Sequence, residues 1–149
     1  MSSKYKGSRN EIIALDSYIK LSRATESINS KISRLLLKNG FTESQFKVLD
    51  ALYHLGPLPQ KILAKKLLKS GGNITMVIDN LEKRGVVERR RGSDDRRLFT
   101  IQLTKKGFTQ IKKLMPLVVE VVYNEIKVLT NGEQNELQSM CKKIGLKQS

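Results

Sequence analysis

The sequence is poor in the residues from which most metal and redox sites are built. Its 149 residues include one cysteine, one histidine and no tryptophan. A single cysteine, Cys141, excludes an intramolecular disulfide and any metal site with several thiolates. Together with His54 alone, it leaves a structural zinc site almost without ligands. We therefore expect no bound metal and no cofactor.

Long apolar runs are also missing. No stretch approaches 18 consecutive apolar residues, and the start "MSSKYKGSRNEII" lacks the apolar run of a signal peptide. These absences predict a protein without membrane contact that works in a reducing cytoplasm.

Catalytic motifs are missing too. The sequence contains no nucleophile–base pair and no Gly-rich nucleotide loop followed by Lys-Ser or Lys-Thr. We therefore expect no enzyme and no catalytic residues.

Acidic residues are scarce relative to basic ones. Fourteen Asp and Glu face 28 Lys and Arg, which gives a net charge of +14. Such a field attracts polyanions, namely DNA, RNA or an acidic membrane surface. Aromatic residues make up only 5% of the chain, and this disfavours RNA because unpaired bases need rings to stack on. A protein that is merely soluble and basic is the alternative.

The N-terminal half reads as a series of helices. Apolar spacing predicts a long helix over residues 10–38, which the pair Asn39-Gly40 ends. A Thr42-x-x-Gln45 capping box opens a second helix, which ends at Gly56-Pro57. A third, short helix begins at Pro59. A brief turn at residues 70–72 then leads into a fourth helix that stops at Gly85, and two short helices joined in this way form a helix-turn-helix.

The C-terminal half predicts a hairpin followed by two helices. The runs "VVERRR" and "LFTIQLT" flank "GSDD" and read as two strands whose connection carries charge. Thr104 is expected to cap the next helix, which Pro116 should kink or interrupt. A second capping box, Thr130-x-x-Glu133, starts the last helix.

These elements predict a mostly α fold with a small β-hairpin wing. Residues 41–104 form a winged helix-turn-helix, the DNA-binding domain. The helices in 10–40 and 105–147 carry more apolar surface than so small a lobe needs, so we expect them to form a dimerisation domain in a two-fold homodimer. The alternative is a monomer in which these helices wrap their own lobe.

The fourth helix is two-faced. Ile74, Val77, Ile78 and Leu81 cluster on the core side of a helical wheel. Short polar side chains on the other faces suit base edges in a major groove, because Asn pairs with adenine and Thr can donate or accept. The residues expected to bind DNA from this helix are Ser70, Gly72, Asn73, Thr75, Met76, Asn80 and Lys83.

Two residues of this helix carry other expectations. Asn73 serves either base or phosphate contact or the capping of the turn before it. Asp79 is a poor neighbour for phosphate, and we expect it to pair with Lys83 or with a wing arginine.

The hairpin carries five arginines within nine residues, at positions 89–91, 96 and 97. Arginine in a narrow minor groove gains from the negative potential there. The alternative is a solvated strand edge that discourages aggregation. The wing residues expected to bind DNA are Arg90, Arg91, Asp95, Arg96 and Arg97.

Several motifs resemble the MarR family of bacterial transcription regulators. They are "SGGNITMVIDNLEKRGVVERR", Asp95-x-Arg97, "IQLTKKG", the upstream "LDALYHLGPLPQKILAKKLL" and the closing "LTNGEQNELQSMCKKIG". The resemblance covers residues 11–146. It implies an obligate dimer that binds a palindromic operator on double-stranded DNA. It also implies that Arg97 reaches the minor groove, that Asp95 braces it and that Arg96 assists.

Many members of that family are repressors released by small phenolic or lipophilic effectors, and others sense oxidants through cysteine. Oxidant sensors of the peroxide-responsive branch carry a reactive cysteine early in the first helix, and here "EIIALDSYIK" has none. We expect Cys141 to be a core residue of the last helix, with redox sensing as the alternative. Tyr18 and Phe46 are also expected in the core. His54 is expected to be a local cap or surface group, with effector contact as the alternative.

The leading hypothesis is a dimeric, sequence-specific DNA-binding regulator, specifically a repressor released by an effector. The alternative is a basic architectural protein that binds DNA with little preference for sequence. The effector and its pocket residues, the operator and the regulated genes are not encoded in any motif.

Overall fold

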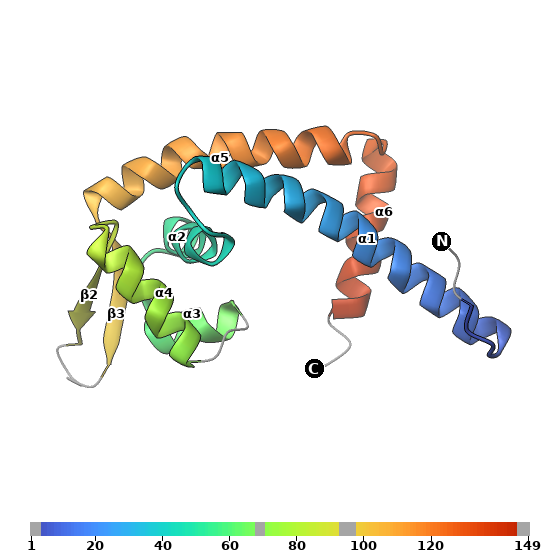
Figure 1. The fold of residues 1–149 in the computed structure, drawn as a ribbon, viewed down its shortest axis with the longest axis horizontal. Helices are drawn as coiled ribbons and strands as arrows, with labels where there is room; N and C mark the ends of the chain where they lie inside the picture. Colours follow the sequence, from blue (N-terminus) through green and yellow to red (C-terminus); the bar gives the residue numbers. More distant parts are fainter. Residues whose placement is uncertain (1–3, 68–70, 93–97, 146–149) are drawn as a thin grey trace. The chain divides into compact units, whose positions relative to one another are not determined.

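The computed structural model of the chain describes residues 4–67, 71–92 and 98–145. The described part is mostly helical with one small sheet, as the sequence predicts (Figure 1). The elements in chain order are α1 (Arg9–Lys38), α2 (Glu43–Leu55), β1 (Leu58–Pro59), α3 (Gln60–Lys66), α4 (Gly71–Lys83), β2 (Val87–Arg91), β3 (Phe99–Leu103), α5 (Lys105–Ile126) and α6 (Asn131–Gly145).

The chain divides into two compact units. Ile32–Val118 forms one, which we call the winged unit, and Met1–Lys31 with Val119–Ser149 forms the other, which we call the terminal unit. The winged unit contains α2, α3, α4, the sheet and the adjoining turns of α1 and α5. Within the terminal unit, the Lys31 ammonium pairs with the Glu125 carboxylate and links α1 to α5.

The helices begin where local hydrogen bonds satisfy their first amides. Both predicted capping boxes form: the Thr42 hydroxyl accepts from the Gln45 amide at 3.2 Å, and Thr130 and Glu133 are bonded in the same reciprocal way. A third box precedes α1, where the Glu11 carboxylate accepts from the Ser8 amide at 2.7 Å. These bonds from Ser8 lower the pKa of Glu11 below its ordinary value. The signal for this third box, Ser8-x-x-Glu11, is visible in the sequence.

A glycine terminates α4 before the wing. Gly85 has φ +73°, its amide donates to the Glu82 carbonyl at 2.9 Å, and the Val86 amide donates to the Leu81 carbonyl at 3.2 Å. This pair of bonds is the Schellman motif, which needs a left-handed residue that glycine adopts without steric cost. The chain therefore leaves α4 in a defined direction, straight into β2.

The sheet has three antiparallel strands in the order β1-β3-β2. The hairpin register pairs Val87 with Leu103 and Arg89 with Ile101, and on the other edge of β3 Leu58 also pairs with Ile101. The hairpin confirms the prediction from sequence. Strand β1 was missed, because two residues that include a proline show no alternating pattern.

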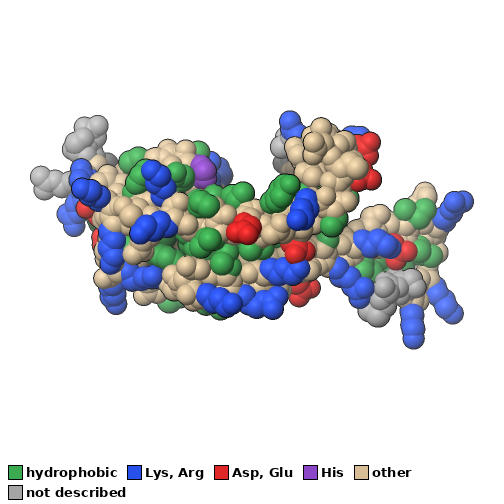
Figure 2. Space-filling view, turned by 90° about the horizontal axis from the view of Figure 1, so that it is seen from above, with side chains coloured by type: hydrophobic (Ala, Val, Ile, Leu, Met, Phe, Trp, Pro, Cys, Tyr) green, Lys and Arg blue, Asp and Glu red, His purple; other side chains and the backbone are tan. Residues whose placement is uncertain are grey.

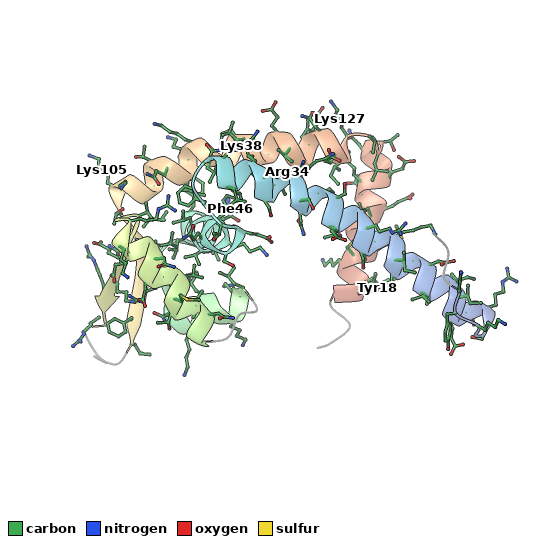
Figure 3. The ribbon with its side chains drawn as sticks, viewed as in Figure 1. Tyr18, Arg34, Lys38, Phe46, Lys105 and Lys127 are labelled. Atoms are coloured by element: carbon green, nitrogen blue, oxygen red, sulfur yellow. The ribbon has the colours of Figure 1, made fainter. Side chains whose placement is uncertain are left out.

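One hydrophobic core holds the winged unit together. The predicted stripe of α4 lies in it: Ile74, Ile78 and Leu81 are buried, and Val77 is partly buried. Phe46 of α2 is also buried, as expected (Figure 3). The remaining buried side chains are Leu36, Phe41, Val48, Leu49, Leu52, Leu63, Val86, Val87, Ile101, Ile111, Leu114 and Val118.

One prediction about helix limits is wrong. Helix α4 begins at Gly71, so Gly71 and Gly72 are helical rather than part of a turn. Glycine costs a helix about 1 kcal/mol relative to alanine, and burial of Ile74 and Ile78 a turn later outweighs this. Ser70 lies outside the described residues. Pro116 lies inside α5, so of its two expected effects the interruption does not occur, and the kink stays a prediction.

The terminal unit contradicts two core assignments. Tyr18 is 67% exposed (Figure 3), and Cys141 is exposed as well. No residue of α6 in the described chain is buried. Periodicity identifies the apolar side of a helix, but it does not say whether the same chain covers that side, and here the described chain leaves both residues uncovered.

Gly107 offers a test of the packing between the wing and α5. It is buried in the first turns of α5, and a Cβ built on it would overlap the backbone carbonyl of Val86. We expect Gly107→Ala to lower the free energy of unfolding by about 1–3 kcal/mol in urea titration, because the overlap lies against backbone that cannot rotate away.

Gly132→Ala is the matched control. That glycine is also helical, and the nearest atom to an added Cβ is the Thr130 hydroxyl oxygen at 3.9 Å, an ordinary contact. It should be neutral or stabilise the chain by about 0.5–1 kcal/mol. Equal effects of the two substitutions would contradict the close approach at Gly107.

Candidate nucleic-acid interface

Helix α4 presents a polar surface to solvent. It packs against α3, α2 and β2 (Figure 1), and its apolar residues face that side. The predicted DNA-binding residues of α4 that are described with their side chains are all exposed: Asn73, Thr75, Met76, Asn80 and Lys83. Periodicity alone therefore separated the accessible face of this helix from its buried face.

The structure places Asn73 inside the helix. It is the third residue of α4. Asn73 therefore does not lie before the helix, where the role of capping a preceding turn would place it. Gly72 is the second residue of the helix. The N-terminal turn of α4 thus carries no charged side chain at positions 71–75, and its backbone amides lie at the positive end of the helix dipole.

Among the wing arginines that the structure describes, Arg89 turns inward. Its side chain is only 17% exposed, and its guanidinium pairs with Asp79 at 2.5 Å and with Glu82 at 2.9 Å. The Arg89 backbone amide also donates to Glu82 at 3.1 Å, and one guanidinium nitrogen lies 3.5 Å from the Thr75 carbonyl oxygen. Asp79 was expected to pair with Lys83 or with a wing arginine, and the structure shows the wing arginine as its partner.

Gln60, the first residue of α3, joins the same cluster. Its side-chain oxygen accepts from Arg89 Nε at 3.4 Å, and its side-chain nitrogen donates to the Thr75 hydroxyl at 2.8 Å. The sheet register explains the meeting, because Leu58 and Arg89 pair with opposite edges of Ile101 and so bring the start of α3 to the level of Arg89. No local pattern in the sequence indicates this contact.

The network has an electrostatic consequence for α4. Asp79 and Glu82 would repel a polyanion approaching the helix, and Arg89 offsets both charges from the protein side. Lys83, the last residue of α4, adds an exposed positive charge. Figure 2 views the chain from another side, that of α5, and blue Lys and Arg side chains outnumber red Asp and Glu side chains there as well.

The described wing arginines beyond Arg89 point outward. Arg90 is 67% exposed and lies 3.2 Å from Glu88 of its own strand, and Arg91 lies over the Phe99 ring at 5.5 Å from its centre. The Gly92 amide donates to the Leu98 carbonyl at 3.0 Å and extends the ladder one step past the strands. Asp95, Arg96 and Arg97 lie outside the described residues, so their roles stay predictions.

A hollow of about 270 Å³ opens on another side of the winged unit. Its lining residues are Asn39, Phe41, Arg84, Gln110, Lys113, Leu114 and Leu117. The Arg84 guanidinium stacks 4.2 Å from the centre of the Phe41 ring and donates to the Gly40 carbonyl at 2.6 Å. Because Arg84 directly follows α4, the hollow adjoins the end of that helix.

Other candidate groups take local roles. His54 lies on the surface, and its Nε2 is 3.0 Å from the carboxylate of Asp50, one turn earlier in α2. It does not line the hollow. Within residues 4–67, 71–92 and 98–145, no group of three or more His, Cys, Asp or Glu could hold a metal ion. The described helices include none long and apolar enough to cross a membrane.

A short helix, a second helix with an exposed polar face, and a basic hairpin that follows directly define a winged helix-turn-helix protein. The MarR family model matches residues 41–99 of this chain. The transcriptional regulator MhqR of Bacillus subtilis is 34% identical over 133 residues, which cover 89% of this chain and 92% of MhqR. The chain therefore belongs to the MarR family of transcriptional regulators, as its motifs indicated.

Two further relatives agree with this assignment. The transcriptional repressor MprA of Escherichia coli K12 is 29% identical over 147 residues, 95% of this chain and 83% of MprA. A solved structure of a mutant MarR from E. coli complexed with operator DNA is similar with a TM-score of 0.72 at 29% identity. The similarity covers 87% of this chain and 96% of that one.

The Arg89 cluster can be tested through stability. We expect Arg89→Met to lower the free energy of unfolding by about 1–2 kcal/mol, because it leaves Asp79 and Glu82 facing each other without their shared cation. Arg90→Met removes the same charge at an exposed position and should change the free energy of unfolding by less than about 1 kcal/mol. Urea titration of both variants is the measurement, and equal losses would show that Arg89 is not a structural link.

Proposed function

We propose that this protein is a sequence-specific regulator that binds double-stranded DNA as a homodimer, and that it acts as a repressor. The observation that carries the proposal is the exposed, uncharged hydrogen-bonding surface at the start of α4, next to outward-facing arginines of the wing. Membership of the MarR family supports it, and so does the likeness to a MarR that was solved with operator DNA.

The two elements would divide the work of binding. In the proposed complex α4 enters the major groove, where Asn73 and Thr75 read base edges and Lys83 contacts phosphate. The wing lies along the backbone with Arg90 and Arg91, while Arg96 and Arg97, beside Asp95, reach the adjacent minor groove. Short neutral groups discriminate between bases, whereas arginines supply affinity through the phosphates.

The helices in 10–40 and 105–147 are proposed to form the dimer. In the terminal unit large apolar side chains lie open to solvent in the single chain, and a second copy would cover them. These side chains are Ile13, Tyr18, Leu21, Val119, Val122, Tyr123, Val128, Met140 and Ile144. A two-fold dimer would set its two α4 helices into major grooves about 34–36 Å apart on a palindromic operator.

Release of the operator is proposed to follow binding of a small phenolic or lipophilic effector. Such a molecule shifts the dimer only through its different affinity for the two dimer shapes, with a coupling on the order of 1–3 kcal/mol. The hollow of about 270 Å³ beside Arg84 is a candidate place for such a molecule. MprA, a relative along nearly the whole chain, is itself a repressor.

We further infer that the protein acts in the cytoplasm and is not an enzyme. The relatives that support this inference are transcriptional regulators. The alternative is an architectural protein that binds DNA with little preference for sequence. The net charge of +14 alone would be enough for such binding.

Selection of binding sites from random duplex DNA at about 150 mM salt separates the two functions, because non-specific contacts weaken there. We expect enrichment of an inverted repeat whose half-sites are about one helical turn apart. Measurable binding without an enriched sequence would replace the proposed function with the architectural one.

The wing assignment predicts a change in salt dependence. Arg97→Ala should weaken operator binding and reduce the slope of log K against log salt by about 0.9, the value for one lost phosphate contact. Lys142→Ala is the control, because it removes the same charge from α6 and should leave the slope unchanged. Equal slopes for Arg97→Ala and the unmodified protein would remove Arg97 from the interface.

A further inference from the structure

The side-chain amide of Gln60 connects Arg89 to Thr75 in a fixed order. A guanidinium carries only donors, so the Gln60 oxygen has to face Arg89 Nε, at 3.4 Å. This leaves the Gln60 amide nitrogen facing the Thr75 hydroxyl oxygen, at 2.8 Å. Thr75 therefore accepts a hydrogen bond from α3, and the direction of that bond is set by the charge on the wing strand.

Arg89 in turn holds one side of α4 along two turns. Its contacts fall on the Thr75 carbonyl, on Asp79 and on Glu82, which are spaced four and three residues apart on the same face of the helix. Because the Arg89 side chain is 17% exposed and has these partners, it is placed for holding α4 and not for meeting phosphate. The cluster thus ties α3, α4 and β2 together directly behind the exposed Thr75.

We propose that Gln60 is a specificity-determining residue that acts by positioning Thr75, although it lies outside α4. A threonine at an exposed helix position can turn its hydroxyl among several directions, and base readout needs one of them. The bond from Gln60 restricts that choice, and Arg89 restricts Gln60. This inference rests on the proposed function, since it concerns which bases α4 reads.

Base preference measured with single and double variants tests this role. Gln60→Met keeps the length of the side chain and the net charge but loses both hydrogen bonds. Thr75→Val keeps the shape of Thr75 and loses its hydroxyl. We expect each variant to reduce discrimination at the same operator base pair by on the order of 5- to 150-fold, the range of one good base contact.

The double variant shows whether the two residues act together. In the Thr75→Val background, Gln60→Met should change base preference little further, because its effect passes through Thr75. The slope of log K against log salt should be unchanged in Gln60→Met, because no phosphate contact is lost. Gln138→Met, the same exchange at an exposed position of α6, is the control and should leave base preference intact.

Stability has to be measured beside binding, since Gln60→Met also loosens the cluster. The thermal unfolding midpoint of every variant should lie well above the assay temperature, so that all variants are folded during the binding measurements. The positioning role is overturned if Gln60→Met leaves base preference intact. It is also overturned if Gln60→Met alters base preference equally with and without Thr75→Val. In both cases the proposed function stands. Failure of the unmodified protein to enrich any site would instead reject the proposed function.

Discussion

The placement of the wing against α4 and the start of α3 depends on the ion pairs of Arg89. One largely buried guanidinium joins the first strand of the wing to Asp79 and Glu82 of α4, and through Gln60 to the start of α3. A partly buried cation of this kind is tolerated because charged partners accept from its donors. The first strand of the wing and α4 are therefore linked by charged contacts as well as by the shared core.

This arrangement also resolves a conflict of charge within α4. The helix needs polar residues for solubility, yet carboxylates near a polyanion oppose binding. Asp79 and Glu82 are turned to a cation of the same protein, while the exposed residues of the first turns are neutral. Affinity and selectivity can then be supplied by different parts, the wing arginines and the short side chains of α4.

The terminal unit follows a different constraint. Its helices are held by local caps and by a few contacts such as the Lys31–Glu125 pair, and they leave apolar side chains in solvent. Tyr18 and Cys141 show why periodicity was insufficient there: the pattern indicates which side of a helix is apolar, and only packing shows whether the same chain covers it. A homodimer is the proposed reason that evolution keeps such faces open in the monomer.

The sequence by itself determined the helices and two of their capping boxes, because these depend on bonds between residues three or four apart and on the apolar period. It also determined the hairpin, through two short runs around a brief connection, and the family, through its motifs. The tertiary structure alone decided that Arg89 faces inward, unlike Arg90 beside it, and that Gln60 meets Thr75. It also decided that the two-residue strand β1 joins the sheet. Those contacts join residues 15 and 29 positions apart, and their partners are selected by strand register and by the packing of α4, which no local pattern encodes.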